Sequence, residues 1–335
     1  MERILVTGGG GFIGSHLAKY LYLQGNFVRV IDTEFNEYIQ EKYCSEKLQL
    51  DLRIWENCLA ATKGVDKIYN LAANMGGIGF INSVGAEVMH DNVLINTHML
   101  EASRQNNVKR FLFSSSACVY PTYRQRNPNV KGLKEEYAYP ADPDNFYGWE
   151  KLFTEKMCEA YRRDCSMDIR IVRYHNIYGP KGTYEGGREK SPAALCRKVA
   201  EALSPETITL WGDGKQTRSY CYIDDAVRGT VMLMGSDHDK PLNIGSDRLV
   251  SIDELADIII KISGKNIARE YDLSAPQGVR GRNADITLAR KIIGWEPKVS
   301  LEEGLARTYR WIEECVRDKL VAAKGEVKAD VVRRK

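Results

Sequence analysis

Tyr147 and Lys151 stand four residues apart in a stretch with a helical pattern, and together they can move a proton during an oxidation. Residues four apart lie on one helix face, so both side chains point into the same cleft. A phenol with a pKa of about 10 is a poor base at neutral pH, and a neighbouring ammonium group lowers that pKa. We therefore predict that Tyr147 exchanges a proton with a substrate hydroxyl while a nucleotide cofactor accepts the hydride.

Ser116 and Cys118 follow the strand predicted over residues 110–114. Ligands of open α/β sheets collect at the carboxyl ends of strands, so both residues are expected near the substrate. In extended geometry alternate side chains share one face, which places the hydroxyl and the thiol together. Ser116 could hydrogen-bond the reacting oxygen. Cys118 is either a small buried residue or a group that acts on the same substrate.

A glycine-rich segment at residues 7–14 lies between the first predicted strand and the first predicted helix, and it contains Gly8, Gly11, Phe12, Ile13 and Gly14. Such glycines permit a tight turn and a close approach to a pyrophosphate, which the helix N-terminus then binds. Asp32 ends the next strand, where a carboxylate bonds the ribose hydroxyls and repels a 2′-phosphate. The segment predicts a site for NAD rather than NADP.

Strands predicted over 4–6, 28–31, 67–72, 110–114 and 169–173 alternate with helical patterns, which predicts a doubly wound parallel Rossmann sheet. After residue 175 the pattern changes, and the polar, glycine-rich residues 179–191 are expected to form a lid or binding loop. We expect a Rossmann domain from residues 1–175 and about 220–247. A smaller α+β substrate lobe would comprise about 176–219 and 248–320, followed by a flexible tail at 321–335.

Composition excludes several functional classes for this chain of 335 residues. The 48 basic and 45 acidic residues nearly balance, and the surplus lies in the tail, so nucleic-acid binding is not expected. There is no run of eighteen apolar residues to span a membrane. The eight cysteines lack CxxC spacing and the histidines are isolated, so we expect reduced thiols, no metal site and a cytoplasmic protein.

These motifs in this order, with Arg173, Asn176-Ile177-Tyr178-Gly179-Pro180 and Trp211-Gly212-Asp213-Gly214, resemble the extended short-chain dehydrogenase/reductases that act on nucleotide sugars. The resemblance covers about residues 3–315 and implies the NAD-dependent epimerase/dehydratase fold. Epimerases, dehydratases and decarboxylases share these motifs, so they indicate the superfamily and not the reaction.

Finer segments are similar to the GDP-mannose 3,5-epimerases, namely residues 71–80, 116–121, 186–194, 216–219 and 278–283. This resemblance implies a further cofactor contact at Asp51. It also implies substrate contacts at Gly76, Ser116, Ala117, Cys118, Asn176, Glu189, Lys190, Ser191, Lys198, Gln216, Arg218, Ser219 and Arg282.

The resemblance implies that GDP-α-D-mannose is oxidised at C4, inverted at C3 and C5, and reduced to GDP-L-galactose, or to the C5 epimer GDP-L-gulose. The C4 ketone would acidify the hydrogens at C3 and C5. Cys118 as base and Lys190 as acid are the candidates for inverting those carbons, because both groups can be tuned to titrate near neutral pH. Arg218 and Arg282 would bind the pyrophosphate, since planar guanidinium groups match phosphate oxygens in pairs.

Two other interpretations remain open at this point. A nucleotide-sugar 4-epimerase or 4,6-dehydratase has the same fold, but a 4-epimerase has no use for Cys118 and Lys190. A non-catalytic NAD-binding protein would not need Ser116, Tyr147 and Lys151 together. Relatives pair through two helices that fall here near 90–106 and 145–162, so a homodimer is expected.

Overall fold

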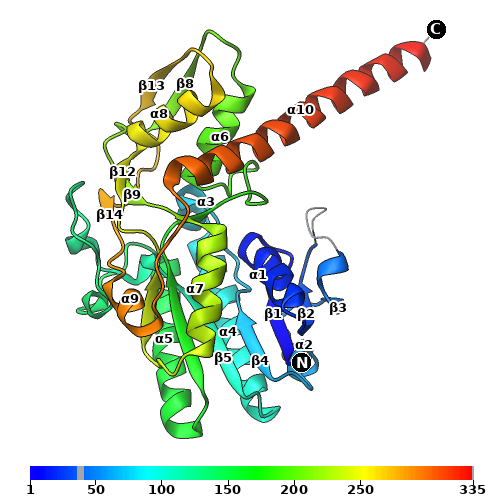
Figure 1. The fold of residues 1–335 in the computed structure, drawn as a ribbon, viewed down its shortest axis with the longest axis vertical. Coiled ribbons are helices and arrows are strands. Elements are labelled where there is room, and N and C mark those ends of the chain that lie inside the picture. Colours follow the sequence, from blue (N-terminus) through cyan, green and yellow to red (C-terminus); the bar gives the residue numbers. More distant parts are fainter. Residues whose placement is uncertain (36–40, 334–335) are drawn as a thin grey trace.

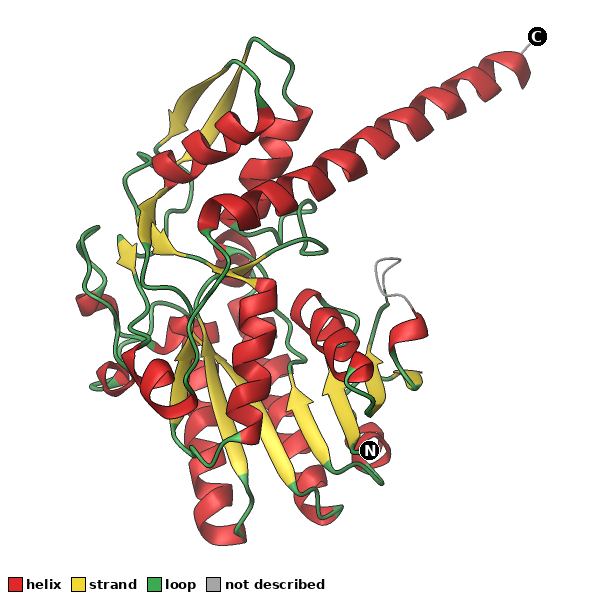
Figure 2. Ribbon diagram, in the orientation of Figure 1, coloured by secondary structure: helices red, strands yellow, loops and turns green. Residues whose placement is uncertain are grey.

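The computed structural model describes residues 1–35 and 41–333, and its larger part is one seven-stranded parallel sheet (Figures 1 and 2). The strand order is β11-β6-β5-β4-β1-β2-β3. From β1, strands β2 and β3 are added on one side and β4, β5, β6 and β11 on the other, as in a doubly wound fold. The strands are β1 (Arg3–Thr7), β2 (Phe27–Asp32), β3 (Glu46–Gln49), β4 (Lys67–Asn70), β5 (Arg110–Ser116), β6 (Ile169–Tyr174) and β11 (Pro241–Ile244). The predicted parallel Rossmann sheet is confirmed.

The central strands are buried along most of their length because helices cover both faces of the sheet. In β1, Ile4 and Val6 belong to one buried cluster while Leu5 belongs to the other, as side-chain alternation requires. One face packs against α2 (Trp55–Thr62), α4 (Gly85–Gln105) and α5 (Phe146–Cys165), and the other against α1 (Phe12–Leu23) and α7 (Ile223–Gly235). The short α3 (Ile78–Ser83) precedes α4, and α9 (Thr287–Ile293) packs near β11.

A smaller α+β lobe lies beyond the carboxyl ends of the strands (Figure 1). It contains α6 (Ser191–Glu201) and α8 (Ile252–Ser263), which pack on each other and on α10 (Leu301–Arg333). Its strands form three small sheets: β8 (Glu206–Trp211) with β13 (Ile267–Asp272); β9 (Thr217–Ser219) with β12 (Leu249–Ser251) and β14 (Gly281–Arg282); and β7 (Ile177–Tyr178) with β10 (Cys221–Tyr222). The predicted smaller α+β lobe is confirmed, while the residue boundaries of the two domains stay a prediction.

The C-terminal helix α10 is longer than the sequence pattern indicated. Its core-facing side chains end near Val316, and Leu320 and Val321 are exposed. The helix nevertheless continues to Arg333 and extends away from the body of the molecule (Figure 1). The segment expected to be a flexible tail is therefore helical as far as the structure describes it, and its flexibility stays a prediction. Within residues 1–35 and 41–333, no helix is both long and apolar enough to cross a membrane.

Candidate active site

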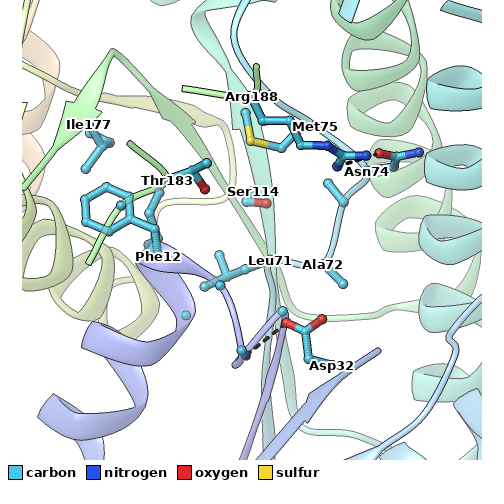
Figure 3. A pocket seen from close by; sticks show the side chains of 18 of the residues that line it. Phe12, Asp32, Leu71, Ala72, Asn74, Met75, Ser114, Ile177, Thr183 and Arg188 are labelled. Atoms are coloured by element: carbon cyan, nitrogen blue, oxygen red, sulfur yellow. Dashed lines mark hydrogen bonds between the residues drawn. The ribbon is translucent and has the colours of Figure 1, made fainter. Parts of the chain in front are cut away.

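A cavity of about 1120 Å³ opens between the sheet and the smaller lobe, at the carboxyl ends of β1, β2, β4, β5 and β6 (Figure 3). Its volume exceeds the upper end of the ~300–1,000 Å³ usual for small-molecule sites, so it has room for an extended ligand. Of the residues predicted from sequence, the lining includes Gly8, Gly11, Phe12, Ile13, Gly14, Asp32, Asp51, Gly76, Ser116, Tyr147, Asn176 and Lys190. The structure thus brings the cofactor residues and several substrate residues into one space.

The glycine-rich turn has the shape that a pyrophosphate site needs. Gly8 has a positive φ of 65°, and a Cβ there would lie 2.9 Å from the Ala72 nitrogen. A Cβ on Gly14 would lie 2.0 Å from the Gly8 oxygen, so this position excludes any side chain. At Gly11, by contrast, a Cβ would contact only the Gly8 oxygen, at 3.3 Å. The backbone at Gly11 therefore lies open to the cavity at the N-terminus of α1, where phosphate oxygens are stabilised.

Two carboxylates lie at the expected adenosine end of the cavity. Asp32 accepts a hydrogen bond from the Gly10 nitrogen at 2.9 Å through Oδ2, and one from the Thr33 nitrogen through Oδ1. Burial raises its pKa above the ordinary value, and these hydrogen bonds oppose that rise. The Arg53 guanidinium, 2.7 Å from Asp51, lowers the pKa of that second carboxyl. Both positions suit the ribose and adenine of a dinucleotide.

Lys151 lies beside Tyr147 on α5 as predicted, but its ammonium group pairs with Glu150 rather than with the Tyr147 hydroxyl. Its Nζ is 5.4 Å from the centroid of the Tyr147 ring and 3.6 Å from Oε1 of Glu150, and both members of this ion pair are buried. Within the described chain the Nζ has no hydrogen-bond partner. A buried ammonium with unused donors fits the ribose hydroxyls of a nicotinamide nucleotide, so the residues present suit NAD.

The expected lowering of the Tyr147 pKa is wrong for this structure. Burial, followed by the negative charges of Glu150 and Cys118, raises the pKa of Tyr147 well above its ordinary value. A hydrogen bond with Ser116 opposes the rise. The physical reason is first that the ring is buried and second that the Glu150 carboxylate compensates the Lys151 ammonium, and the residue spacing alone revealed neither.

Ser116 and Cys118 lie together, but the backbone between them is not extended as expected. The strand ends at Ser116, and residues 117–119 form a 3-10 turn rather than extended chain. The Ser116 hydroxyl caps this turn by accepting a hydrogen bond from the Cys118 nitrogen at 3.1 Å. Ala117 is buried within the turn. The hydroxyl and the thiol are thus fixed relative to each other and adjacent to Tyr147.

Lys190 reaches the same site from the segment that precedes α6. It lines the cavity, and part of its side chain remains exposed to solvent. Loss of hydration among the surrounding groups lowers the pKa of Lys190, and the Cys118 charge acts in the opposite direction. Cys118 therefore acts electrostatically on the Lys190 amine, and a direct proton transfer between the two groups stays a prediction.

Arg282 and Arg218 lie side by side on the paired strands β14 and β9. Arg282 donates to Oε1 of Gln125 and to the Cys118 Sγ, and its Nη2 is 3.3 Å from Asp144. Burial and the neighbouring Arg282 lower the pKa of Arg218 to about 10. Two partly desolvated guanidinium groups with one carboxylate between them favour an anion. The pyrophosphate role stays a prediction, and the contact of Arg282 with Cys118 was not foreseen.

The remaining predicted substrate residues lie around this end of the lobe. Glu189 and Gln216 each keep one buried side-chain oxygen, Oε2 and Oε1, without a partner in the described residues, so both could accept a hydrogen bond from a ligand. The hydroxyls of Ser191 and Ser219 are already engaged, with Tyr220 and with the Ala284 nitrogen. Lys198 donates to the Thr209 oxygen at 2.6 Å. Their roles toward a substrate stay predictions.

Comparison with known proteins places this geometry in a family. Residues 4–245 match the model of the NAD dependent epimerase/dehydratase family. The chain belongs to this family. NAD is accordingly its cofactor, in agreement with the glycine-rich turn and Asp32.

Members of the family with different substrates are similar to the chain. It is 48% identical, over 93% of its length and 82% of the relative's, to GDP-mannose 3,5-epimerase 1 of Oryza sativa subsp. japonica. Among solved structures, UDP-glucose 4-epimerase of Thermotoga maritima superposes with a TM-score of 0.85 at 28% identity, covering 93% of this chain and 99% of that one. UDP-glucuronic acid 4-epimerase of Bacillus cereus, in complex with UDP-glucuronic acid and NAD, gives a TM-score of 0.81 at 27% identity with the same coverage.

Sequence reasoning missed a buried polar chain behind this family's Tyr and Lys. Asn92 of α4 donates to Oε1 of Glu150 at 2.9 Å, and it exchanges hydrogen bonds with the backbone of Asn74. A buried Glu directly before Lys151 was the available signal, because such a charge needs a partner. Asn74 and Asn92 gave no signal, since neither occurs in a pattern that differs from an ordinary loop or helix. In the described part of the chain, no cluster of His, Cys, Asp and Glu could hold a metal ion.

Proposed function

We propose that this enzyme inverts C3 and C5 of GDP-α-D-mannose through a transient ketone at C4, giving GDP-L-galactose and the C5 epimer GDP-L-gulose. The observation that carries the proposal is the position of Cys118. Its nitrogen donates to the Ser116 hydroxyl, its sulfur accepts from Arg282, and the pKa values of both Tyr147 and Lys190 depend on it. Tyr147, Cys118 and Lys190 therefore form one group of candidate acids and bases. The 48% identity to a GDP-mannose 3,5-epimerase supports this choice of substrate.

Tyr147 and Ser116 handle the C4 oxygen in this proposal. NAD supplies the reversible oxidation at that carbon. Tyr147 takes the hydroxyl proton and later returns it, while the Ser116 hydroxyl, which hydrogen-bonds Tyr147, holds the oxygen in line. Lys151 would hold the ribose of the cofactor through its unused donors, and the Ser116 hydrogen bond, which opposes the rise in the Tyr147 pKa, favours the phenolate. Burial of Tyr147 and Lys151 excludes water from the transfer.

Cys118 and Lys190 serve the carbons on either side of the ketone. Inversion needs one group to remove a proton from one face and a second group to deliver one to the other face. The Cys118 thiolate removes the proton and the Lys190 ammonium delivers one. Arg282, hydrogen-bonded to the Cys118 sulfur, stabilises the thiolate. The lowered pKa of Lys190 makes it a better proton donor than an exposed lysine.

Separate incubations with GDP-mannose and UDP-glucose, followed by NMR identification of the products, test this proposal. We expect conversion of GDP-mannose to the galactose and gulose epimers and no conversion of UDP-glucose. Conversion of UDP-glucose to UDP-galactose with GDP-mannose unchanged would replace the proposal with a 4-epimerase. Bound NAD with no turnover of either sugar would indicate a non-catalytic protein.

We further propose that the enzyme is a homodimer in the cytoplasm. Phe146, Trp149 and Phe153 lie on one face of α5 and are 60%, 42% and 52% exposed, an apolar stripe next to α4. A two-fold pairing of α4 and α5 would cover it. Light scattering should give a dimer mass at micromolar concentration, and Phe153→Glu should give a monomer. The buried cysteines are thiols rather than disulfides, which suits a reducing compartment.

A further inference from the structure

We propose that Arg188 is a positioning residue for Lys190: its guanidinium contacts Phe80 and Asn74 and so holds Lys190 at the turn formed by residues 74–80. The inference rests on the proposed function and adds to it a residue that does not itself touch the reacting carbons. Arg188 lies two residues before Lys190, on the rim of the cavity. Figure 3 shows its side chain directed at Asn74.

Three contacts attach the Arg188 segment to the turn at residues 74–80. The guanidinium carbon lies 3.8 Å from the centroid of the Phe80 ring, and Nη1 donates to Oδ1 of Asn74 at 3.3 Å. The Arg188 carbonyl accepts a hydrogen bond from the Gly77 nitrogen at 2.9 Å. The two backbones approach so closely that a Cβ on Gly77 would lie 2.4 Å from the Glu189 oxygen. A cation over an aromatic face at this distance is a favourable contact.

Asn74 is itself held rigidly by the buried chain behind Tyr147 and Lys151. Its nitrogen donates to Oδ1 of Asn92 at 2.7 Å, and its carbonyl accepts from Nδ2 of Asn92 at 3.1 Å. Asn92 donates in turn to Glu150, the ion-pair partner of Lys151. A continuous path therefore runs from Lys151 through Glu150, Asn92 and Asn74 to Arg188.

Further contacts orient Asn74 and hold Glu189, the residue between Arg188 and Lys190. The Asn74 amide nitrogen lies 3.0 Å from Oε1 of Glu87 and 3.2 Å from Oδ2 of Asp91, so its oxygen is turned toward Arg188. On the α6 side, Arg197 pairs with Oε1 of Glu189 at 3.3 Å. These contacts hold the two residues that directly precede Lys190, which caps the start of α6. Without the Arg188 guanidinium the segment would keep the Gly77–Arg188 backbone hydrogen bond and the Arg197–Glu189 pair, but it would lose its contacts with Phe80 and Asn74.

This arrangement matters because Lys190, the proposed acid at C3 and C5, and the Tyr147–Lys151 pair, which serves oxidation at C4, come from different parts of the chain. Lys190 lies on a polar, glycine-rich segment in which Gly186 and Gly187 both have positive φ values of 83°. Such a segment has no regular structure to hold its register. Misplacing a reacting group by about 1 Å can cost about 100-fold in rate. Arg188 ties the segment to the same frame that carries Lys151, so the amine stays aligned with the carbons next to C4.

The experiment compares two steps of one reaction in Arg188→Met, which keeps the aliphatic stem and removes the guanidinium. Oxidation at C4 is followed by absorbance at 340 nm after mixing the NAD-loaded enzyme with GDP-mannose. Proton exchange is followed by NMR as deuterium incorporation at C3 and C5 in D₂O. We expect incorporation per C4 oxidation to fall about 10- to 100-fold, the cost of a misplaced acid. Arg188→Lys should recover part of the loss, because an ammonium can still lie over Phe80.

Arg163→Met is the matched control, because Arg163 is exposed and forms an ion pair with the adjacent Asp164. This variant should show the same deuterium incorporation per C4 oxidation as the unaltered enzyme. An unchanged ratio in Arg188→Met, or an equal fall in both steps, would overturn the positioning role. A higher KM for GDP-mannose at an unchanged ratio would show instead that Arg188 binds phosphate. Failure of the unaltered enzyme to oxidise or exchange GDP-mannose would contradict the proposed function itself, which keeps the two failures distinct.

Discussion

Nη1 of Arg282 lies 3.3 Å from the Sγ of Cys118, and the two residues are 164 positions apart in the chain. Burial opposes the charge on Arg282, but Cys118 and Asp144 raise its pKa above the ordinary value, so the guanidinium remains a cation. The β9–β14 pairing thus brings a fixed positive charge to a thiol on the opposite side of the site. The contact makes Arg282 the first residue at which to test the acid–base half of the reaction.

Replacing Arg282 should impair proton exchange more than oxidation. Arg282→Met removes a charge-assisted hydrogen bond to sulfur, a loss of about 1.5–3 kcal/mol or roughly 10- to 100-fold in exchange at C3 and C5. NMR of deuterium incorporation measures this. Arg280→Met is the control, because Arg280 is two residues away and pairs with Asp213 rather than with Cys118. Equal exchange in the two variants would contradict a role for Arg282 at the thiol.

Tyr147→Phe should abolish oxidation at C4 while leaving the fold intact. The ring is buried and loses only its hydroxyl, so packing is retained, whereas removing a general base costs about 100- to 10,000-fold in rate. The measurement is the 340 nm absorbance change on adding GDP-mannose, with the thermal midpoint recorded in parallel. Tyr123→Phe, which alters a partly exposed phenol bonded to the Pro140 oxygen, should behave as the unaltered enzyme. Normal oxidation by Tyr147→Phe would remove Tyr147 from this step.

Alanine substitutions at two glycines of the nucleotide-binding turn should impair different properties, stability at Gly14 and NAD binding at Gly11. Gly14→Ala places a Cβ 2.0 Å from the Gly8 oxygen, so the turn cannot form and the thermal midpoint should fall. Gly11→Ala brings its Cβ to 3.3 Å from the Gly8 oxygen, which a shift of a few tenths of an ångström relieves, but the methyl group occupies the space expected for phosphate. We expect a near-normal midpoint and weakened NAD binding by calorimetry. Gly235→Ala, with no atom within 4 Å of the new Cβ, is the neutral control.

The pH profile of proton exchange should report the Lys190 ammonium. As an acid, Lys190 must be protonated, so exchange should decline as pH rises through its pKa. Because loss of hydration lowers that pKa below 10.5, the decline should begin at lower pH than for an exposed lysine. Lys190→Arg keeps its proton at all accessible pH values, so whatever exchange it supports should lack the alkaline decline. An identical alkaline decline in this variant would assign the titration to another group.

The sequence predicted those parts of the fold and site that depend on local pattern. The glycine spacing, the strand that ends at Asp32 and the four-residue interval of Tyr147 and Lys151 each follow from chain geometry, and the structure has them in the predicted elements. The extended geometry expected at Cys118 is replaced by a 3-10 turn, because the Ser116 hydroxyl offers the backbone a local hydrogen bond.

The contacts that could not be predicted join residues far apart in sequence. Glu150 takes up the charge of Lys151 because Asn92, from another helix, completes its hydrogen bonding. Arg282 meets Cys118 only through the strand pairing of the smaller lobe. Neither relationship has a spacing signature, since each depends on where two distant segments pack.

The central claim is that oxidation at C4 makes the hydrogens on C3 and C5 acidic enough to exchange with solvent. The direct measurement is NMR of the nucleotide sugar recovered after incubating the unaltered enzyme with GDP-mannose in D₂O. We predict deuterium at C3 and C5, none at C4, and inverted configuration at the labelled carbons in GDP-L-galactose. A sugar inverted at C4 with no deuterium at C3 or C5 would contradict the account.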